Sequence, residues 1–454
     1  MTAHLHHVGE AVSRRTFLRG TLATAGLGVT AGALAACGSP AAAGLAGAPL
    51  DPQTLTFWNL FGGGDGVRLQ VMLDEYAKQH GGPSSLQAAT FAWGNPYYTK
   101  VSLATLGSKP PDVAVAHLTR AQNMAQANLL TPITDDMLAS VGLKSTDFNP
   151  KVWEAQKLNG KSWVVPLDTH PFVMFYHSEI CQKAGLLDAG GKLKPIQGTA
   201  EWESALTAIK KVTGAYGAAS ANVADFATPW RFFQTLYSQR NGATPFISDG
   251  GTKLTVNQDL ATNTLEYIQK LSKANLLAPT ADYAGAQTLM FTGKAGFYLE
   301  GPWEITTAQG ITGLKFGMVP IPQIFDKVAN QADSHTFVLP RMDRTQEQMT
   351  RAMGFMKTML EQSLTWAKGG HIPAYLPTLQ SSEYKALTPQ ADYASAADVA
   401  VYDAPAWYSG SGSTFENIAG AQIGLVQQGL TSPAGGMSAM LSQLDTYLNT
   451  PSPL

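Results

Sequence analysis

The stretch Thr54-Leu55-Thr56-Phe57-Trp58-Asn59 decides the fold class of this chain. Its alternating aromatic and β-branched residues predict a strand. Gly62-Gly63-Gly64-Asp65-Gly66 follows, and then come apolar residues at helical spacing that stop at Gly81, which predicts a helix. The order then recurs, with strands predicted at 86–93 and 112–116 and helices at 97–106 and 119–127. Such alternation indicates βαβ units and a buried, mainly parallel sheet.

The later part of the chain continues the α/β pattern. Two strands, 160–166 and 171–177, flank Leu167-Asp168-Thr169-His170. Further helices are predicted near 199–212, 228–240, 258–274, 283–292, 345–367 and 412–430, with a strand at 294–299. Two α/β lobes, each with its own sheet, fit this pattern better than one very large sheet.

Composition excludes several classes of protein. The 454 residues suggest two or three domains. A net charge of −2 with only 14% charged residues argues against a nucleic-acid protein. Two cysteines form neither a disulfide framework nor a four-thiolate metal site. The chain lacks the P-loop, G-x-S-x-G and H-E-x-x-H patterns, so we expect no enzyme, no cofactor and no metal.

Residues 1–36 are typical of an export signal. Arg14 and Arg15 precede a weakly apolar run, an order that resembles the twin-arginine type, and a transmembrane anchor is the alternative. Leu34-Ala35-Ala36-Cys37 resembles a bacterial lipobox, in which Cys37 carries a lipid, although a chance cysteine remains the alternative. Residues 37–52 are predicted to be a flexible tether. The second cysteine, Cys181, is interpreted as a buried, inert thiol.

Several short phrases, in order, resemble the extracellular solute-binding proteins of bacterial ABC importers. The likeness is to family 1, the carbohydrate-type branch that includes the maltose-binding protein. The matching phrases are Lys109–Val113, Leu129–Ile133, Asn159–Pro166, Tyr176-His177 with Ala184–Leu186, Gly293–Gly296 with Gly301–Trp303, and Gly369–Pro373.

The resemblance implies a two-lobe, periplasmic-binding-protein-like α/β fold. Its lobes are joined by a hinge of crossing segments and close over a ligand cleft between them. Crossings are expected near 167–170, 334–339 and 377–385. The N-terminal lobe would hold 53–168 plus 337–380, and the C-terminal lobe 169–336 plus 381–454.

Aromatic residues are the first candidates for binding a sugar, because flat rings with few rotatable bonds pack against its C–H faces. By the resemblance, Trp303 matches a stacking tryptophan, Trp407 and Tyr408 match an aromatic pair ahead of the final predicted helix, and Trp230 matches a third aromatic region. For each tryptophan, packing in the core is the alternative.

Polar candidates follow the predicted strands of the first lobe and the hinge. Asp65 either accepts from hydroxyl groups or caps the following helix. Ala116 and Thr119 stand where the maltose type carries a tryptophan and an aspartate, which puts a maltodextrin ligand in doubt. The full set of candidate ligand-binding residues is Asn59, Phe61, Asp65, Trp93, His117, Arg120, Asp168, His170, Trp230, Glu300, Trp303, His371, Trp407 and Tyr408.

The function expected from the resemblance is that of a lipid-anchored, monomeric receptor. It would capture a sugar or oligosaccharide by hinge closure at the outer face of the cytoplasmic membrane and deliver it to an ABC permease. One alternative is a glycerophosphodiester or sugar phosphate, held by Arg120, Arg231, His117 and His170. Another is a secreted glycoside hydrolase with Glu300 and Glu304 as its carboxylate pair.

Overall fold

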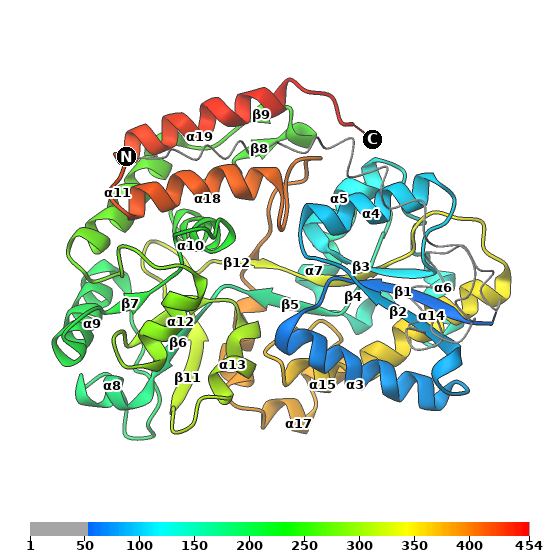
Figure 1. Cartoon of the computed structure of the whole chain (residues 1–454), viewed down its shortest axis with the longest axis horizontal. Coiled ribbons are helices and arrows are strands. Elements are labelled where there is room, and N and C mark those ends of the chain that lie inside the picture. Colours follow the sequence, from blue (N-terminus) through cyan, green and yellow to red (C-terminus); the bar gives the residue numbers. More distant parts are fainter. Residues whose placement is uncertain (1–52, 454) are drawn as a thin grey trace, which may run out of the picture. The chain divides into compact units, whose positions relative to one another are not determined.

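The computed structural model describes residues 53–453, which form two lobes (Figure 1). Arg14, Arg15 and Cys37, and with them the predicted export signal and lipid attachment, lie outside the described residues. Among residues 53–453, no helix has the length and apolar character that crossing a membrane requires.

The first lobe is built on a five-stranded sheet of order β2-β1-β3-β13-β4. Its strands are β1 (Leu55–Asn59), β2 (Leu86–Thr90), β3 (Val113–His117), β13 (His335–Val338) and β4 (Val165–Pro166). The helices that belong to this lobe are α3 (Gly63–Gln79), α4 (Asn95–Leu106), α5 (Leu118–Gln126), α6 (Asp135–Ser140), α7 (Pro150–Ala155), α14 (Gln346–Glu361) and α15 (Ser363–Ala367). Helices α4 and α5 lie on one side of the sheet and α3 and α14 on the other (Figure 1), and every residue of β3 is buried as a result.

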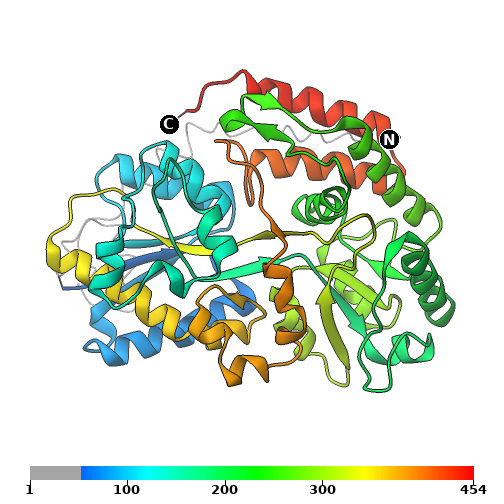
Figure 2. The ribbon, with the colours of Figure 1, turned by 180° about the vertical axis from the view of Figure 1, so that it is seen from behind.

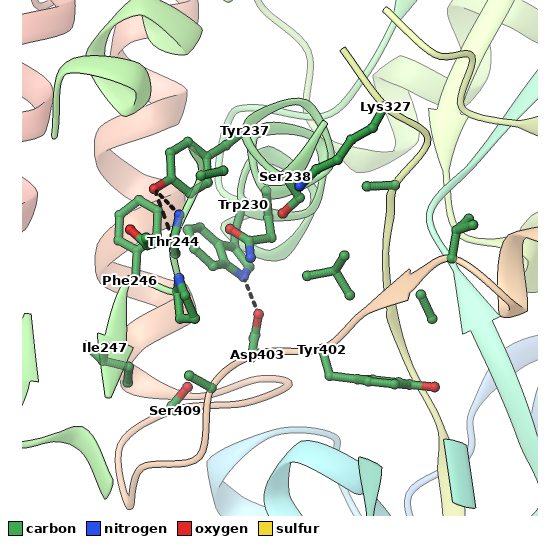
Figure 3. Close-up of a pocket in the computed structure, with 18 of the residues that line it drawn as sticks. Trp230, Tyr237, Ser238, Thr244, Phe246, Ile247, Lys327, Tyr402, Asp403 and Ser409 are labelled. Carbon is green, nitrogen blue, oxygen red and sulfur yellow. Dashed lines mark hydrogen bonds between the residues drawn. The ribbon is translucent and has the colours of Figure 1, made fainter. Parts of the chain in front are cut away.

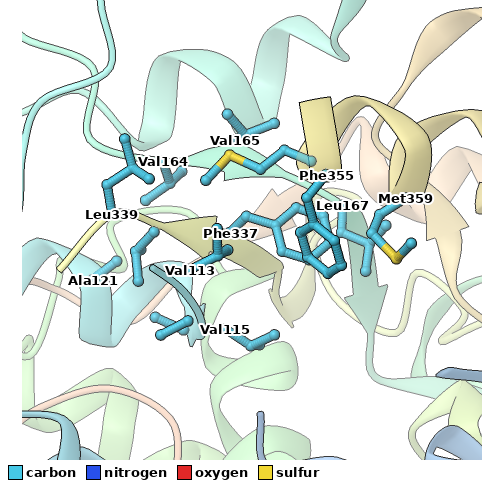
Figure 4. Close-up of a cluster of buried hydrophobic side chains, with 14 of the residues drawn as sticks. Val113, Val115, Ala121, Val164, Val165, Leu167, Phe337, Leu339, Phe355 and Met359 are labelled. Carbon is cyan, nitrogen blue, oxygen red and sulfur yellow. The ribbon is translucent and has the colours of Figure 1, made fainter. Parts of the chain in front are cut away.

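The core of this lobe joins the central strands to helix α14 (Figure 4). The ring of Phe57 lies 4.8 Å from that of Phe355 and 6.2 Å from that of Phe337. Phe337 belongs to β13, a strand that enters the sheet more than two hundred residues after β3. The first lobe is therefore completed by a segment that returns from the second lobe.

The second lobe has a four-stranded sheet of order β11-β6-β10-β7. Its strands are β11 (Phe316–Pro320), β6 (Val173–His177), β10 (Phe297–Glu300) and β7 (Ala218–Ala219), and a small hairpin consists of β8 (Ile247–Ser248) and β9 (Lys253–Leu254). Its helices are α8 (Ser178–Lys183), α9 (Gly198–Thr213), α10 (Ala227–Ser238), α11 (Gln258–Lys273), α12 (Tyr283–Phe291), α13 (Ile305–Gln309), α18 (Thr414–Gln427) and α19 (Pro433–Leu448). Cys181 is a free, buried cysteine in α8, and burial raises the pKa of its thiol to about 12.

A third sheet of order β14-β5-β12-β15 lies between the lobes. It contains β14 (Ile372–Pro373), β5 (Asp168–Pro171), β12 (Asn330–Asp333) and β15 (Ala400–Val401). Strand β5 connects β4 of the first lobe to β6 of the second, and β12 leads back into β13. The segment from α16 (Leu376–Leu379) and α17 (Ser382–Lys385) through the short helix Gln390–Ala397 to β15 crosses in front in Figure 2.

Three features differ from the sequence-based expectations. Residues 168–171 form a strand of the hinge sheet, where the prediction left a connection between strands. The first sheet is parallel only around β1, because β13 pairs antiparallel with both β3 and β4 after its return from the second lobe. A last helix, α19, follows the helix predicted at 412–430 and packs on α18 and α11.

Candidate functional site

A cavity of about 530 Å³ lies between the lobes, on one side of the hinge sheet. Its size falls in the usual range of small-molecule sites, roughly 300–1,000 Å³. The first lobe and the hinge contribute Leu60, Phe61, Gly62, Asp65, Trp93, His117, His170 and His335. The second lobe contributes Ala224, Asp225, Phe226, Ala227, Thr228, Arg231, Tyr283, Trp303 and Asn417.

On the first lobe, the cavity lies at the carboxyl ends of the parallel strands, where open α/β sheets bind ligands. Phe61 and Asp65 follow β1, Trp93 follows β2, and His117 is the last residue of β3. Gly62 is the N-cap of α3, so Asp65 lies inside the first turn and the N-cap alternative for Asp65 is wrong. Its carboxylate instead accepts a hydrogen bond from His371 Nε2 at 2.9 Å.

On the second lobe, the half-buried ring of Trp303 is held by its neighbours. Its Nε1 donates to the Tyr283 hydroxyl at 2.8 Å, and the Arg231 guanidinium lies 5.0 Å from the ring centroid. A Cβ at Gly301 would lie 2.0 Å from the ring, so only glycine allows this position. The indole therefore has a fixed orientation at the cavity wall.

Arg231 brings a positive charge to the cavity from within an acidic environment. Its Nη2 lies 3.6 Å from Glu416 Oε1, and Glu416, Glu300 and Asp225 together raise the pKa of the guanidinium despite its burial. Burial raises the pKa of Glu416 to about 7 and that of Glu300 to about 8, with Arg231 opposing both shifts. The arginine therefore offsets the cost of buried carboxyl groups and also faces the cavity.

Asp168 is the buried centre of a group of histidines. His170 Nδ1 donates to Asp168 Oδ1 at 3.0 Å, and His335 Nδ1 donates to Oδ2 at 2.8 Å. The backbone N–H of His335 and Nε1 of Trp366 also donate to this carboxylate, at 2.8 and 2.6 Å. The surrounding histidines hold the pKa of Asp168 well below its usual range even though burial opposes this shift, so it remains a carboxylate.

The histidines differ in protonation. Burial, with the neighbouring His335, lowers the pKa of His170 to about 3, and burial likewise lowers the pKa of His117 well below its usual value. The pKa of His371 is raised to about 10 by Asp65 and Asp168, which outweigh its burial. His117 and His170 therefore line the cavity as neutral rings, and the Tyr98 hydroxyl orients His117 through Nδ1 at 2.7 Å.

Glu300→Gln is expected to weaken the pH dependence of stability. The pKa of Glu300 is about 8 in the folded state, which is higher than in the unfolded chain. Its contribution to the free energy of unfolding is therefore fully present below the unfolded pKa and is lost as the pH rises through 8. Glutamine keeps an acceptor for the backbone N–H of Gly301, which donates to Glu300 Oε1 at 2.9 Å. Urea unfolding at pH 5 and pH 8 should show a smaller loss in the variant.

The matched control for that experiment is Glu347→Gln, which changes an exposed carboxylate of α14. It should leave the wild-type difference between pH 5 and pH 8 unchanged. An equal pH dependence in Glu300→Gln and the wild type would contradict the raised pKa.

Of the fourteen candidate ligand-binding residues, the structure brings one group to the cavity and places the others elsewhere. Those that line it are Phe61, Asp65, Trp93, His117, His170 and Trp303. Asp168 and His371 lie directly behind the lining histidines and orient them. Asn59 hydrogen-bonds the backbone N–H of Phe61, and Glu300 accepts from the Thr228 hydroxyl, so both support residues of the wall. Arg120 stacks on Tyr98, 4.3 Å from its centroid.

Trp230 lines a different cavity, of about 430 Å³ (Figure 3). Its Nε1 donates to Asp403 at 2.9 Å, and its ring packs edge-on against Phe415. Neighbouring residues of a helix point about 100° apart, so Arg231 reaches the cleft while Trp230 points away from it. Sequence reasoning selected the aromatic residue of this pair for the main site.

Trp407 and Tyr408 are not among the residues that line the cleft cavity. Trp407 packs on Tyr447 of α19, with 5.7 Å between ring centroids, and Tyr408 donates to the backbone carbonyl of Gly251. The sequence predicts this pair just ahead of the final helix, but α19 follows that predicted helix, and its Tyr447 packs against both rings. The unforeseen helix explains the misplacement.

Sequence reasoning left several lining residues out of the main set. Asp225, Tyr283 and Asn417 stand at or near the first turns of helices α10, α12 and α18, and that position was the available signal. His335 gave no local signal, because its strand joins the first sheet only through tertiary pairing with His117.

Comparisons with known proteins show the family and the fold of this chain. The profile described as bacterial extracellular solute-binding protein matches residues 40–363, more than half of the chain. The chain belongs to this family. The match confirms the family resemblance and the two-lobe α/β fold expected from the sequence. Among curated protein sequences, none matches this solute-binding protein.

Solved structures share the fold at low sequence identity. The GacH receptor of Streptomyces glaucescens, described unliganded and with acarbose, is 18% identical with a TM-score of 0.71, covering 87% of this chain and 98% of that one. The cyclic α-maltosyl-1,6-maltose binding protein of Arthrobacter globiformis is 20% identical, with a TM-score of 0.68 and coverages of 88% and 99%. The maltose-maltodextrin binding protein of Alicyclobacillus acidocaldarius is 18% identical, with a TM-score of 0.66 and coverages of 86% and 100%.

Proposed function

We propose that this solute-binding protein captures a sugar or oligosaccharide for an ABC importer. The observation that carries the proposal is the cavity between the lobes, where half-buried aromatic rings stand beside hydrogen-bonding side chains. Trp303 and Tyr283 offer flat apolar faces, while Asp65, Asp225 and Arg231 offer acceptors and donors for hydroxyl groups. The structural neighbour described in complex with acarbose and the one described as a maltose-maltodextrin binding protein support the same class of ligand.

The proposed mechanism is hinge closure. A ligand that contacts both lobes binds the closed form more tightly and shifts the population toward it. The moving bodies would be residues 53–168 with 337–380, and 169–336 with 381–454. The closed lobes would then present one composite surface to the permease.

A thermal-shift and tryptophan-fluorescence screen against mono- and oligosaccharides tests the ligand class. At least one sugar should raise the melting temperature in a saturable manner without being consumed. Release of product from an oligosaccharide would instead support the glycoside hydrolase. Glu300 and Glu304 argue against that alternative, because neither lines the cavity and both accept hydrogen bonds from neighbouring side chains, Thr228 and Tyr283.

Glycerophosphodiesters and sugar phosphates belong in the same screen. Among the described residues, Arg231 is the only lysine or arginine that lines the cavity, and the carboxyl groups of Glu416, Glu300 and Asp225 surround it. The guanidinium already lies 3.6 Å from Glu416 Oε1, so it offers a phosphate no unpaired cation. Stabilisation by a phosphorylated ligand alone would overturn the neutral-sugar proposal.

We also propose that the mature chain begins at Cys37 and is held at the outer face of the membrane by a lipid on this residue. Cys37→Ala should release the exported protein from the membrane fraction. The measurement is fractionation and immunoblotting, with Cys181→Ala as the control that stays membrane-bound. Membrane attachment of Cys37→Ala would contradict acylation.

A further inference from the structure

Four buried side chains converge behind the histidines of the cavity. Asp168, His170, His335 and His371 each offer one ligand atom, and these atoms all lie within 4.8 Å of one another. Asp168 Oδ1 is 3.0 Å from His170 Nδ1, and Asp168 Oδ2 is 2.8 Å from His335 Nδ1 and 3.2 Å from His371 Nδ1. In a tetrahedral zinc site with bonds of about 2.0–2.2 Å, ligand atoms are about 3.4 Å apart.

His371 supplies the second, independent observation. The ring is fully buried, and its Nδ1 points at this cluster, 3.2 Å from Asp168 Oδ2 but without the geometry of a hydrogen bond. Its other nitrogen, Nε2, donates to Asp65 Oδ1 at 2.9 Å. A carboxylate on the far nitrogen of an imidazole is the usual outer partner of a metal-bound histidine, because it fixes the ring and the position of the proton.

We propose that Asp168, His170, His335 and His371 bind one divalent transition-metal ion at the base of the ligand cavity. Three imidazole nitrogens and one carboxylate oxygen form a ligand set suited to Zn²⁺. His170 and His335 line the cavity, so the ion has a path of entry.

Proton balance at the site is simple. The ion takes the place of the hydrogens that the Nδ1 atoms now direct toward Asp168. His170 and His335 carry their proton on Nε2 when the metal is bound. His371 keeps its Nε2–H on Asp65 and releases one proton to solvent.

The ion would connect segments that are far apart in the sequence. Asp168 and His170 belong to β5, His335 begins β13, and His371 directly precedes β14. A bound metal would therefore tie together the strands at which the chain crosses between the lobes. Because the four residues span more than two hundred positions, no metal-binding spacing is visible in the sequence.

The test uses the full chain, stripped with EDTA and titrated with Zn²⁺ and with Co²⁺. We expect one Co²⁺ with the visible absorption of tetrahedral coordination, and a rise of several degrees in the melting temperature with Zn²⁺. His4, His6 and His7 near the N-terminus are a second group of imidazoles in the full chain. The thermal shift distinguishes uptake by them from uptake at the proposed site, because only an ion held by the folded lobes opposes unfolding.

Variants locate the ion. His371→Gln and His170→Gln should each weaken Zn²⁺ binding at least about 100-fold and abolish the thermal shift, and Asp65→Asn should weaken it about 10–100-fold. His80→Gln, an exposed histidine of the first lobe, is the matched control and should bind like the wild type. If circular dichroism shows that His371→Gln does not fold, Zn²⁺ binding by His170→Gln tests the proposal. No uptake, an octahedral Co²⁺ spectrum, or uptake unchanged in His170→Gln would overturn the proposal.

Discussion

Asp168→Ala is expected to lower the free energy of unfolding by about 4 kcal/mol or more, measured by guanidinium unfolding in the presence of EDTA. The carboxylate is fully buried and accepts from four donors, which belong to His170, Trp366 and, twice, His335. A buried donor left without an acceptor costs about 1–3 kcal/mol. Because the donors share one network, these costs do not add fully.

The charge of Asp168 adds to this cost. His371 carries a proton between Asp65 and Asp168, so alanine at 168 leaves a buried cation with one partner where it had two. Removal of one partner from a buried ion pair typically costs about 3–5 kcal/mol. The loss therefore reaches both lobes through the hinge sheet, where β5 pairs with β12 and β14.

Two comparisons make the stability experiment specific. Asp168→Asn keeps the shape of the side chain and one acceptor, so its loss should be smaller than that of the alanine variant. Asp445→Ala, at an exposed position of α19, should change stability by less than about 0.5 kcal/mol. A loss below about 1 kcal/mol in Asp168→Ala would show that the histidine group does not depend on this carboxylate.

Trp303→Ala should weaken the binding of the sugar identified in the screen at least tenfold, while the protein stays folded. The half-buried ring is part of the cavity wall, and it also positions Tyr283 by a hydrogen bond of 2.8 Å and Arg231 by a cation–π contact of 5.0 Å. Its removal takes away a flat face and frees two polar partners. A tenfold change is about 1.4 kcal/mol of binding free energy, and isothermal titration calorimetry measures it.

Trp407→Ala is the matched control for this substitution. Its ring packs on Tyr408 and Tyr447, away from the cleft cavity, so its loss should lower the melting temperature and leave affinity within twofold. An equal loss of affinity in both variants would place the ligand elsewhere. Unchanged affinity in Trp303→Ala would remove this tryptophan from the site.

The positions of the site residues show which of them a local sequence pattern can predict. Phe61, Trp93 and His117, three candidates chosen from the sequence, lie together at the cavity, because the carboxyl ends of neighbouring parallel strands meet at one edge of a sheet. The sequence predicted Trp230 for the cleft cavity, whereas its neighbour Arg231 lines that cavity. They are adjacent in the sequence, and only the packing of α10 decides which of the two faces the cleft.

The sequence by itself determined the alternation of strands and helices, the family, and the strand-end residues of the first lobe, since these depend on periodicity and short-range order. Only the tertiary structure showed the pairing of the hinge sheet, the packing of α19 on Trp407 and the grouping of the histidines around Asp168. Asp168 meets His335 across 167 positions, and His371 meets Asp65 across 306. Contacts at such separations arise from chain crossings between lobes, and no local pattern of residues encodes them.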